Sequence, residues 1–472
     1  MPVLAIDQGT TSTRALLVDD SGARPVLARS HRQHYPCPGW VEHDATELLA
    51  HVRDCLDAAQ GLPVAAVGIA NQGESCLGWD ALTGDPVGPV IVWQDDRTAD
   101  ITARLRNEGC EALVRASAGL PLDPYFSAAK LGWILRENPA AQRLHAKGRL
   151  RLGTTDAFFR DRLTGRFETD VTTASRTSLM NLQSRDWDPA LCALFGVPLD
   201  CLPPITTTTG PLGRIGDFPL TASVVDQQAA LHGHGCRAPG DAKITFGTGA
   251  FALVLTGALR DAEGVLPTIA WARAGEAPVH ALDGGVYAAS AAVNWAGGLG
   301  LFKAVSQLDS FDAPPAIARG LCFVPALTGL ACPHWDRRAR GAWMGLGLDT
   351  TARDMAQAVL EGIAFRMTEV MERMERVVAI NEPVSIDGGM SANPWFCRFL
   401  SGALGRAIRV SNEPELTAVG TAALAAQGAG LVLVPPCSGT LIKADPLPTH
   451  WHARFAAARE AVQSFGAAEA RH

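Results

Sequence analysis

Short apolar runs separated by polar turns mark the first part of the chain. Three such runs occupy residues 2–6, 14–18 and 25–28. Runs of this length bounded by turn residues are typical of strands, so we predict a three-stranded meander here. A fourth apolar run at residues 64–70 predicts a buried strand that leads into the polar turn at 71–74.

Helical spacing of apolar residues begins after Asp44, with Glu47 three positions later as in a capping box. The apolar positions between Leu48 and Ala59 then recur along one face of a helix. Methionines on the apolar face of a later helix, at 354–376, are expected to pack in the core. The same spacing predicts helices at 127–137 and 155–163 and in the tail from about residue 450.

The pattern of the first residues returns near residue 240. The stretches 243–246 and 250–255 flank the tip Gly247-Thr248-Gly249, which again predicts strand, glycine-threonine turn and strand. Two halves that each open with such a hairpin suggest a duplicated architecture with a nucleotide held between them.

Length and composition limit the class of protein. A chain of 472 residues with 47% hydrophobic and 19% charged residues should form two or three globular domains. The net charge of -7 and the scattered basic residues argue against nucleic acid or anionic membrane as partners. We find no apolar window long enough for a membrane span. Eleven cysteines without a C-x-x-C pair favour reduced thiols, and we expect a soluble cytoplasmic protein.

The first hairpin carries groups suited to a nucleotide. Its tip offers backbone N–H groups and hydroxyls to phosphate oxygens, and Gly9 allows close approach. Asp7, at the end of the first strand, could hold Mg²⁺ directly or through water. Many hairpins of this composition bind no ligand, so this segment alone leaves both interpretations open.

A second acid, Asp226, follows an apolar stretch and precedes a helix-like run. Open α/β sheets place reactive groups at such strand-to-helix junctions. One carboxylate for metal and one to accept a hydroxyl proton, beside phosphate-sized hairpins, would suffice for phosphoryl transfer to an alcohol. A helix N-cap is the alternative role for Asp226, and it fits the local pattern equally well.

A third element is the strand at 384–387, which ends in Gly388-Gly389 and is followed by a helix. Small residues there would let a flat base lie against the backbone, with Asn393 available to ribose or adenine. The chain contains neither the G-x-G-x-x-G fingerprint of nicotinamide enzymes nor a Walker P-loop.

A mixed polar and aromatic set is suited to a polyol, because carboxylates and amides bind hydroxyls while aromatic faces cover C–H surface. These residues are Gln72, Glu74, Trp93, Asp95, Asp96, Tyr125 and Phe251.

Two long motifs give the chain a family resemblance. Residues 125–137 and the segment from Gly341 to Glu361 fit the two signatures of the FGGY carbohydrate kinases, in the right order. Within that family the chain most resembles the glycerol kinases, through segments such as Asp7-Gln-Gly-Thr-Thr and Ala174-Ser-Arg-Thr177. The likeness runs from residue 3 to about residue 430.

The resemblance implies an α/β, two-domain actin-like ATPase (ribonuclease H-like) fold with an interdomain cleft. It implies an N-terminal domain at 1–238 for polyol and phosphate, a C-terminal domain at 239–472 for nucleotide, and a homo-oligomer, dimer or tetramer. The implied reaction is ATP-dependent phosphorylation of a terminal hydroxyl, with glycerol converted to glycerol 3-phosphate, and the implied cofactors are ATP and Mg²⁺.

The resemblance also assigns roles to residues. Asp226 would be the catalytic base, and Asp7 and Asp226 would hold the metal. The nucleotide would be bound by Thr10, Thr11, Ser12, Arg14, Thr248, Gly249, Asn294, Gly389 and Asn393. The polyol would be bound by Gln72, Glu74, Trp93, Tyr125, Asp226, Gln227 and Phe251.

One departure from the glycerol kinase pattern affects the expected substrate. Those kinases usually read Asn-Gln-Arg-Glu-Thr where this chain has Gly73 between Gln72 and Glu74. Losing that arginine removes a donor fork and its bulk. We therefore keep as alternatives a longer polyol, a tetritol such as erythritol or threitol, admitted by the emptied volume, and a ketose such as xylulose. A non-catalytic ATP-binding sensor on the same fold is the alternative from another class.

Overall fold

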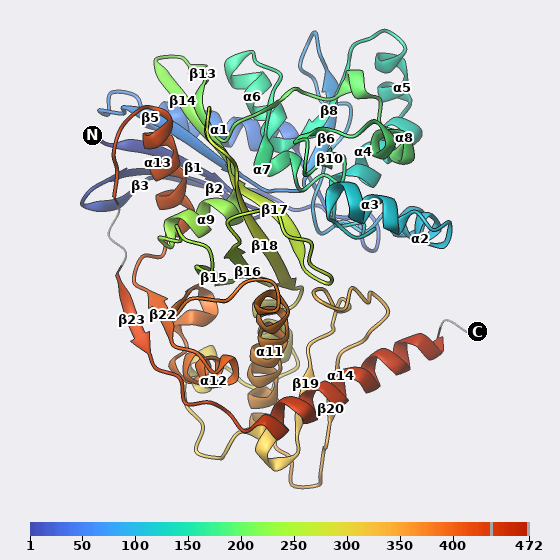
Figure 1. The fold of residues 1–472 in the computed structure, drawn as a ribbon, viewed down its shortest axis with the longest axis vertical. Helices are drawn as coiled ribbons and strands as arrows, with labels where there is room; N and C mark the ends of the chain where they lie inside the picture. Colours follow the sequence, from blue (N-terminus) through green and yellow to red (C-terminus); the bar gives the residue numbers. More distant parts are fainter. Residues whose placement is uncertain (435–437, 470–472) are drawn as a thin grey trace. The chain divides into compact units, whose positions relative to one another are not determined.

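The computed structural model describes residues 1–434 and 438–469 (Figure 1). The chain forms two compact units that interleave along the sequence. The first contains Met1–Gly235, Pro267–Ala281 and a late segment that begins at Glu415, and the second contains Cys236–Leu266, Leu282–Pro414 and the described residues from 438 onward. Among the described residues, no helix combines the length and the apolar composition needed to cross a membrane.

Helices and strands alternate through both units. The α-helices are α1 Ala45–Ala58, α2 Ala99–Asn107, α3 Glu111–Ala118, α4 Ser127–Glu137, α5 Pro139–His145, α6 Thr155–Thr164, α7 Val171–Ala174, α8 Pro189–Phe195, α9 Asp226–Gly233, α10 Ser290–Gly298, α11 Ala352–Glu375, α12 Pro394–Leu404, α13 Leu416–Gly428 and α14 Thr449–Glu469. The short 3-10 helices are η1 Leu199–Cys201, η2 Val305–Leu308, η3 Ala316–Arg319 and η4 Gly389–Ala392.

Most strands belong to two large sheets. The strands of the six-stranded sheet, in the order β13-β14-β5-β1-β2-β3, are β13 Thr209–Ile215, β14 Phe218–Val225, β5 Ala66–Asn71, β1 Val3–Gln8, β2 Ser12–Asp19 and β3 Gly22–Ser30. Those of the seven-stranded sheet are β17 Leu266–Trp271, β18 Val279–Val286, β16 Ala250–Leu255, β15 Ala242–Phe246, β21 Val384–Gly388, β22 Ile408–Ser411 and β23 Gly439–Ile442. Smaller sheets comprise β4 Glu42–His43, β7 Val90–Ile91, β6 Cys76–Asp80 and β8 Leu150–Thr154, then β10 Met180–Asn181 with β11 Asp186–Trp187, β12 Ile205–Thr206 with β9 Thr169–Asp170, and β19 Cys322–Val324 with β20 Ala342–Met344.

The predicted elements are confirmed closely where the apolar pattern is clear. The meander β1–β2–β3 is antiparallel throughout, and the buried strand β5 pairs with β1 in parallel. Asp44 is the N-cap of α1 and accepts hydrogen bonds from the backbone N–H groups of Thr46 and Glu47. The helix α4 has the predicted bounds, and Met374 of α11 is fully buried in the core.

Side-chain size decides how helices cover the two faces of the first sheet. On β5, Val67 and Ile69 join the apolar cluster that contains the buried face of α1. Gly68 lies between them and points to the opposite face, because successive strand residues alternate. A Cβ at Gly68 would lie 2.8 Å from the Thr421 side chain of α13, so glycine allows this helix to pack directly on the sheet.

The helix α13 also packs against α9. A Cβ at Gly420 of α13 would lie 1.8 Å from the Ala229 carbonyl oxygen, and one at Gly233 of α9 would lie 2.0 Å from the Leu416 carbonyl oxygen. The two helix backbones therefore touch, which only small residues permit. This contact explains why a segment near the end of the chain belongs to the first unit, and it fixes the position of α9.

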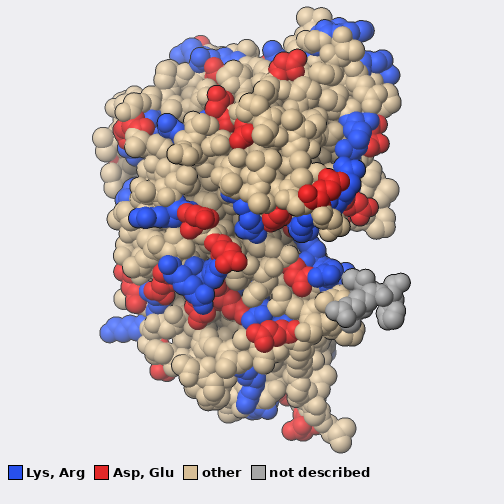
Figure 2. Space-filling view, turned by 45° about the vertical axis from the view of Figure 1, so that its right-hand side comes forward, with Lys and Arg blue, Asp and Glu red and all other residues tan. Residues whose placement is uncertain are grey.

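Charged side chains of both signs are distributed over the surface. On the face in Figure 2, Lys and Arg lie interspersed with Asp and Glu. This mixed distribution agrees with the scattered basic residues of the sequence.

Candidate active site

Hydrogen bonds within the tip and from His31 hold the tip of the first hairpin, residues 9–12. The Gly9 N–H donates to the Ser12 carbonyl at 3.0 Å. The Nε2 atom of His31 lies 3.0 Å from the Gly9 carbonyl and 3.1 Å from the Thr10 carbonyl. Thr11 is exposed at the tip. The tip is thus a fixed loop with an exposed threonine, and binding of an anion there stays a prediction.

Asp7 is the penultimate residue of β1, just before this tip in the chain, with 5% of its surface exposed. Arg14, on the adjacent strand, donates to Asp7 Oδ2 at 2.9 Å and to Glu415 Oε1 at 2.7 Å. Burial raises the pKa of Asp7, and the charge of Arg14 acts in the opposite direction. The guanidinium predicted to hold phosphate therefore lies between two carboxylates of the first unit.

Asp7 and Asp226 lie at the same edge of one sheet. Asp7 is in register with Ala70 of β5, and Ala70 is in register with Val224 of β14. Asp226 follows two residues after Val224, at the start of α9. The two parallel strand ends are two strand spacings apart, about 10 Å. Both residues thus lie at the same end of the first unit's sheet, and their joint binding of a metal ion stays a prediction.

The local structure at Asp226 differs from an ordinary N-cap. The capping position belongs to Val225, and Asp226 is the first residue of α9. Its Oδ1 accepts a hydrogen bond of 2.6 Å from the N–H of Gln227, the other residue predicted here. The side chain is half-buried. The alternative assignment of Asp226 as N-cap is therefore wrong.

A buried polar network lies behind β14 and positions its end. The Val225 N–H donates to Thr172 Oγ1 at 3.0 Å, and the Thr172 hydroxyl donates to Asp170. Asp156 accepts from Ser223 of β14 and, at 2.7 Å, from the Asp170 N–H. Burial and the charge of Asp156 raise the pKa of Asp170 to about 7. This network fixes the backbone that carries Asp226.

The raised pKa of Asp170 predicts a pH-dependent stability. Between about pH 4 and pH 7 the folded protein holds a proton that the unfolded chain releases, so stability falls as pH rises through this range. Asp170→Asn should remove that loss and narrow the difference in urea midpoint between pH 5 and pH 8.

Asp188→Asn is the matched control, because Asp188 is also a helix N-cap but its pKa is lowered. Asp188 titrates below this range, so the difference in urea midpoint between pH 5 and pH 8 should equal that of the parent. An unchanged pH dependence in Asp170→Asn would contradict the assignment.

The space beside Gly73 is filled. A Cβ there would lie 3.1 Å from Val225 Cγ1 and 3.5 Å from Arg176 Cγ. The expected emptied volume is therefore wrong, because side chains from β14 and from the turn after α7 occupy it. Arg176 also donates from Nε to Glu74 Oε1 at 2.7 Å, and both side chains are buried. The guanidinium of Arg176 thus contacts Glu74 from another segment of the chain. In the family pattern, the residue directly before this glutamate is an arginine.

Aromatic rings surround this ion pair. The guanidinium carbon of Arg176 lies 5.9 Å from the Tyr125 ring centre and 5.7 Å from that of Phe126. The rings of Trp93 and Tyr125 meet edge to face at 5.7 Å. Trp93 Nε1 donates to Thr10 Oγ1 at 3.0 Å, which connects the predicted polyol residues to the phosphate hairpin.

Gln72, also predicted to bind polyol, is buried and bonded to its own surroundings. Its Nε2 atom lies 3.2 Å from the Gly9 carbonyl as donor, and its Oε1 accepts from the Ser75 hydroxyl at 2.9 Å. The amide thus supports the hairpin, and contact with substrate stays a prediction.

A buried lysine holds the aromatic segments together. Lys130 of α4 donates from Nζ to the carbonyl oxygens of Val92, Trp93 and Tyr125 at 3.0, 3.2 and 3.0 Å. Burial lowers the pKa of Lys130 to about 8. The side chain is fully inaccessible, so its role is to fix the backbone behind two predicted substrate residues.

The second hairpin, in the second unit, is tied to a helix start. The carbonyl of Thr248 accepts from the N–H groups of Ala289 and Ala291 at 3.0 and 3.1 Å, beside the beginning of α10. Thr248 is exposed, as is Asn294 on α10. A Cβ at Gly249 would lie 2.7 Å from the Val286 carbonyl oxygen and 3.4 Å from the ring of Phe251, so only glycine fits.

The glycine step after β21 leaves open backbone. Gly388 has φ of +90°, and a Cβ there would lie 2.3 Å from the Phe246 carbonyl oxygen. A Cβ at Gly389, by contrast, would have no heavy atom within 4 Å, so open space lies beside this residue, and its contact with a base stays a prediction. Asn393 caps α12 by accepting from the Phe396 N–H at 2.8 Å and donates to the Leu308 carbonyl at 2.9 Å, so its contact with adenosine stays a prediction.

Two residues of this site were absent from the predicted set. Arg176 and Lys130 both lie in segments that carry the family resemblance, yet no local pattern marks them as site residues. The available signal was Lys130 itself, a single charged residue within the otherwise apolar stretch 128–135.

Known proteins match most of this chain. The N-terminal domain of the FGGY family of carbohydrate kinases matches residues 2–222, and its C-terminal domain matches residues 242–429. A glycerol kinase from a Geobacter species is 41% identical over 449 residues, which cover 91% of this chain and 90% of that protein.

Solved structures share the fold. The crystal structure of Plasmodium falciparum glycerol kinase with ADP has a TM-score of 0.87 at 27% identity and covers 98% of both chains. A xylulose kinase from Rhodospirillum rubrum has a TM-score of 0.83 at 22% identity over 99% of this chain and 100% of that chain, a likeness in fold alone. The two-domain α/β kinase fold implied by the motifs is confirmed, and the chain belongs to the FGGY family of carbohydrate kinases.

Proposed function

We propose that this protein transfers the γ-phosphoryl group of ATP to a terminal hydroxyl of glycerol and so forms glycerol 3-phosphate. The main support is that Asp226 and the first hairpin share one sheet edge, while Trp93 connects that hairpin to the Glu74–Arg176 pair. The 41% identity to a glycerol kinase over most of both chains supports glycerol as the acceptor.

In the reaction, Asp226 accepts the proton of the attacking hydroxyl. The transition state of phosphoryl transfer is loose, so the proton leaves late and positioning is the main requirement. Glu74 and Arg176 bind the remaining glycerol hydroxyls as acceptor and donor. Trp93 and Tyr125 cover the C–H surface with their rings.

The carboxylates suit the magnesium ion that ATP-dependent kinases use. Asp7 and Asp226 offer the hard oxygen ligands that Mg²⁺ prefers and would hold it at the sheet edge. When bound, the ion would neutralise charge on the β- and γ-phosphates.

Nucleotide contacts are proposed on both units. Thr10, Thr11, Ser12 and Arg14 would receive phosphate oxygens on the first unit, and Thr248 and Gly249 on the second. Gly389, with Asn393 and Asn294, would border the adenosine.

The acceptor decides between the leading proposal and its alternatives. ADP release with magnesium should be measured against glycerol, erythritol, threitol, xylulose and no acceptor. We expect the highest kcat/KM for glycerol, because Val225 and Arg176 occupy the space beside Gly73 that a longer polyol would need. Preference for a tetritol or ketose would overturn the assignment of glycerol, and no turnover with any acceptor would favour the ATP-binding sensor.

Restoring the usual arginine should harm this protein. In Gly73→Arg, the new Cβ meets Val225 at 3.1 Å, and the added guanidinium competes with Arg176 for Glu74. We expect kcat/KM for glycerol to fall about tenfold, or about 1.4 kcal/mol, as for one lost hydrogen bond. Gly73→Ala is the control for backbone effects and should change kcat/KM less. A rise in glycerol affinity in Gly73→Arg would show that Arg176 does not replace the missing side chain.

Removing the buried lysine should affect glycerol more than ATP. Lys130→Met takes away the donor to three carbonyls behind Trp93 and Tyr125. We expect KM for glycerol to rise about tenfold or more, since a displaced ring or backbone loosens the substrate. Lys243→Met changes a buried lysine of the second unit and should leave KM for glycerol unchanged. An equal rise of KM for glycerol in Lys130→Met and Lys243→Met would contradict the positioning role of Lys130.

Two further expectations remain proposals. A homo-oligomer, dimer or tetramer, can be checked by light scattering of the purified protein. A cytoplasmic location can be checked by cell fractionation.

A further inference from the structure

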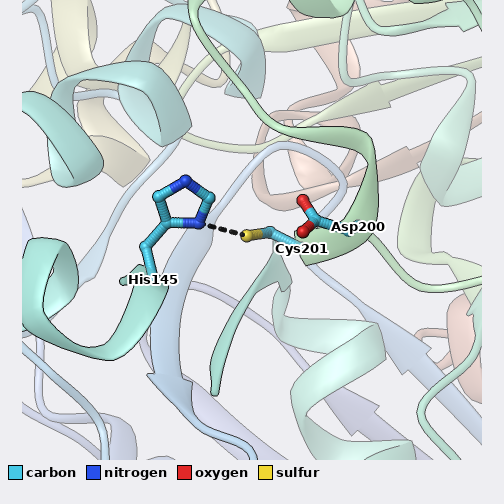
Figure 3. A group of neighbouring side chains, drawn as sticks. All are labelled: His145, Asp200 and Cys201. Carbon is cyan, nitrogen blue, oxygen red and sulfur yellow. Dashed lines mark hydrogen bonds between the residues drawn. The ribbon is translucent and has the colours of Figure 1, made fainter. Parts of the chain in front are cut away.

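A histidine, an aspartate and a cysteine meet in the first unit at residues that play no part in the proposed kinase site. His145 is the last residue of α5, and Asp200 and Cys201 lie in the 3-10 helix η1 (Figure 3). The Cys201 sulfur lies 3.5 Å from Nδ1 of His145. One ligand atom from each of the three side chains lies within 4.8 Å of the other two.

One of these distances, between the Cys201 sulfur and the His145 nitrogen, matches the ligand separation in a zinc centre. With zinc bonds of about 2.0–2.3 Å in a tetrahedron, ligand atoms lie about 3.5 Å apart. The imidazole and thiol already have this separation, and a rotation of the exposed Asp200 side chain would bring its carboxylate to the third corner. In Figure 3 the Cys201 sulfur points toward the His145 ring, and the Asp200 carboxylate lies on the other side of Cys201.

The donor set selects the class of metal. One imidazole nitrogen, one sulfur and one carboxylate oxygen suit a borderline divalent ion such as Zn²⁺, whereas Mg²⁺ and Ca²⁺ prefer oxygen alone. Burial and the neighbouring charge of Asp200 raise the pKa of the Cys201 thiol to about 12.

We propose that His145, Asp200 and Cys201 form a zinc-class metal site, separate from the magnesium site of the proposed reaction. Because three protein ligands leave the fourth tetrahedral position open and Asp200 faces solvent, water completes the shell. On binding, the Cys201 S–H proton passes to solvent as the S–Zn bond forms. The ion then links the end of α5 to η1, two segments 56 residues apart in the chain.

Cobalt is a suitable probe, because a thiolate ligand gives Co²⁺ an intense near-ultraviolet charge-transfer band. Chelator-treated full-length protein should be titrated with Co²⁺ and then with Zn²⁺ in competition against a zinc indicator. We expect one equivalent of Co²⁺ to produce the band, Zn²⁺ to displace it, and the melting temperature to rise with free Zn²⁺.

Variants assign the signal to these side chains. Cys201→Ser should abolish the band and weaken Zn²⁺ binding by at least about 100-fold, since even outer-shell partners are worth 10–100-fold. Cys192→Ser is the matched control, because Cys192 is another buried thiol whose pKa is about 12, and it should retain both signals. His145→Gln changes a half-buried residue and repeats the test if Cys201→Ser does not fold. Absence of the band in the parent, or its survival in the Cys201 and His145 variants, would overturn the site.

Discussion

Replacing Asp226 by asparagine is expected to lower kcat for glycerol phosphorylation by about 10²–10⁴-fold, the usual contribution of a positioned general base. The amide has nearly the same shape and can still accept the hydrogen bond from the Gln227 N–H, so the start of α9 should survive. Nucleotide binding should change little. ADP release with magnesium and glycerol measures the first effect, and equilibrium binding of ATP measures the second.

Asp44→Asn is the matched control for this variant. Asp44 also stands at a helix start of the first unit, but it caps α1, a role that asparagine fills equally well. Its activity should equal that of the parent. An active Asp226→Asn enzyme would refute the role of Asp226 as base, whereas loss of ATP binding in that variant would point to the metal instead.

Removing the buried guanidinium should produce the second large effect. Arg176→Met deletes the donor to Glu74, and breaking a buried ion pair costs about 3 kcal/mol of stability. If Arg176 also binds a glycerol hydroxyl, KM for glycerol should rise about 10–100-fold, the equivalent of a charged hydrogen bond. Urea unfolding measures stability, and initial rates at varied glycerol measure KM.

Arg160→Met separates stability from substrate binding. Arg160 is also fully buried and donates to Thr206 at 2.7 Å and to Glu168 at 2.5 Å, away from the aromatic residues of the site. It should lose stability while KM for glycerol stays as in the parent. Equal KM values in the two variants would reduce Arg176 to a structural role.

Much of the fold could be predicted from local pattern. The meander β1–β3, the buried strand β5, the cap at Asp44 and the bounds of α4 all follow from turn residues and periodicity. The placement of α13 could not be predicted in this way. It depends on Gly68, Gly233 and Gly420, whose missing side chains allow backbones to touch, and such contacts join residues hundreds of positions apart.

The same distinction between local pattern and tertiary contacts applies to the candidate site. The chain's own motifs predicted Asp7, Asp226 and both hairpins as parts of the site, because glycine-threonine turns and strand-to-helix junctions are local features. Motifs could not tell that Arg14 would pair with Asp7 and Glu415, since partners of a long side chain are chosen in three dimensions.

The sequence by itself thus determined the family and the first hairpin of each large sheet, since each is encoded within a short stretch of residues. It also singled out Asp7 and Asp226, whose roles stay predictions. Only the tertiary structure decided what lies beside Gly73. When glycine stands in place of a large residue, the neighbouring side chains decide whether any space remains. Here Val225 and Arg176, from two other segments, fill it. Close packing of protein interiors is the reason, because a vacancy is filled wherever nearby side chains can reach it.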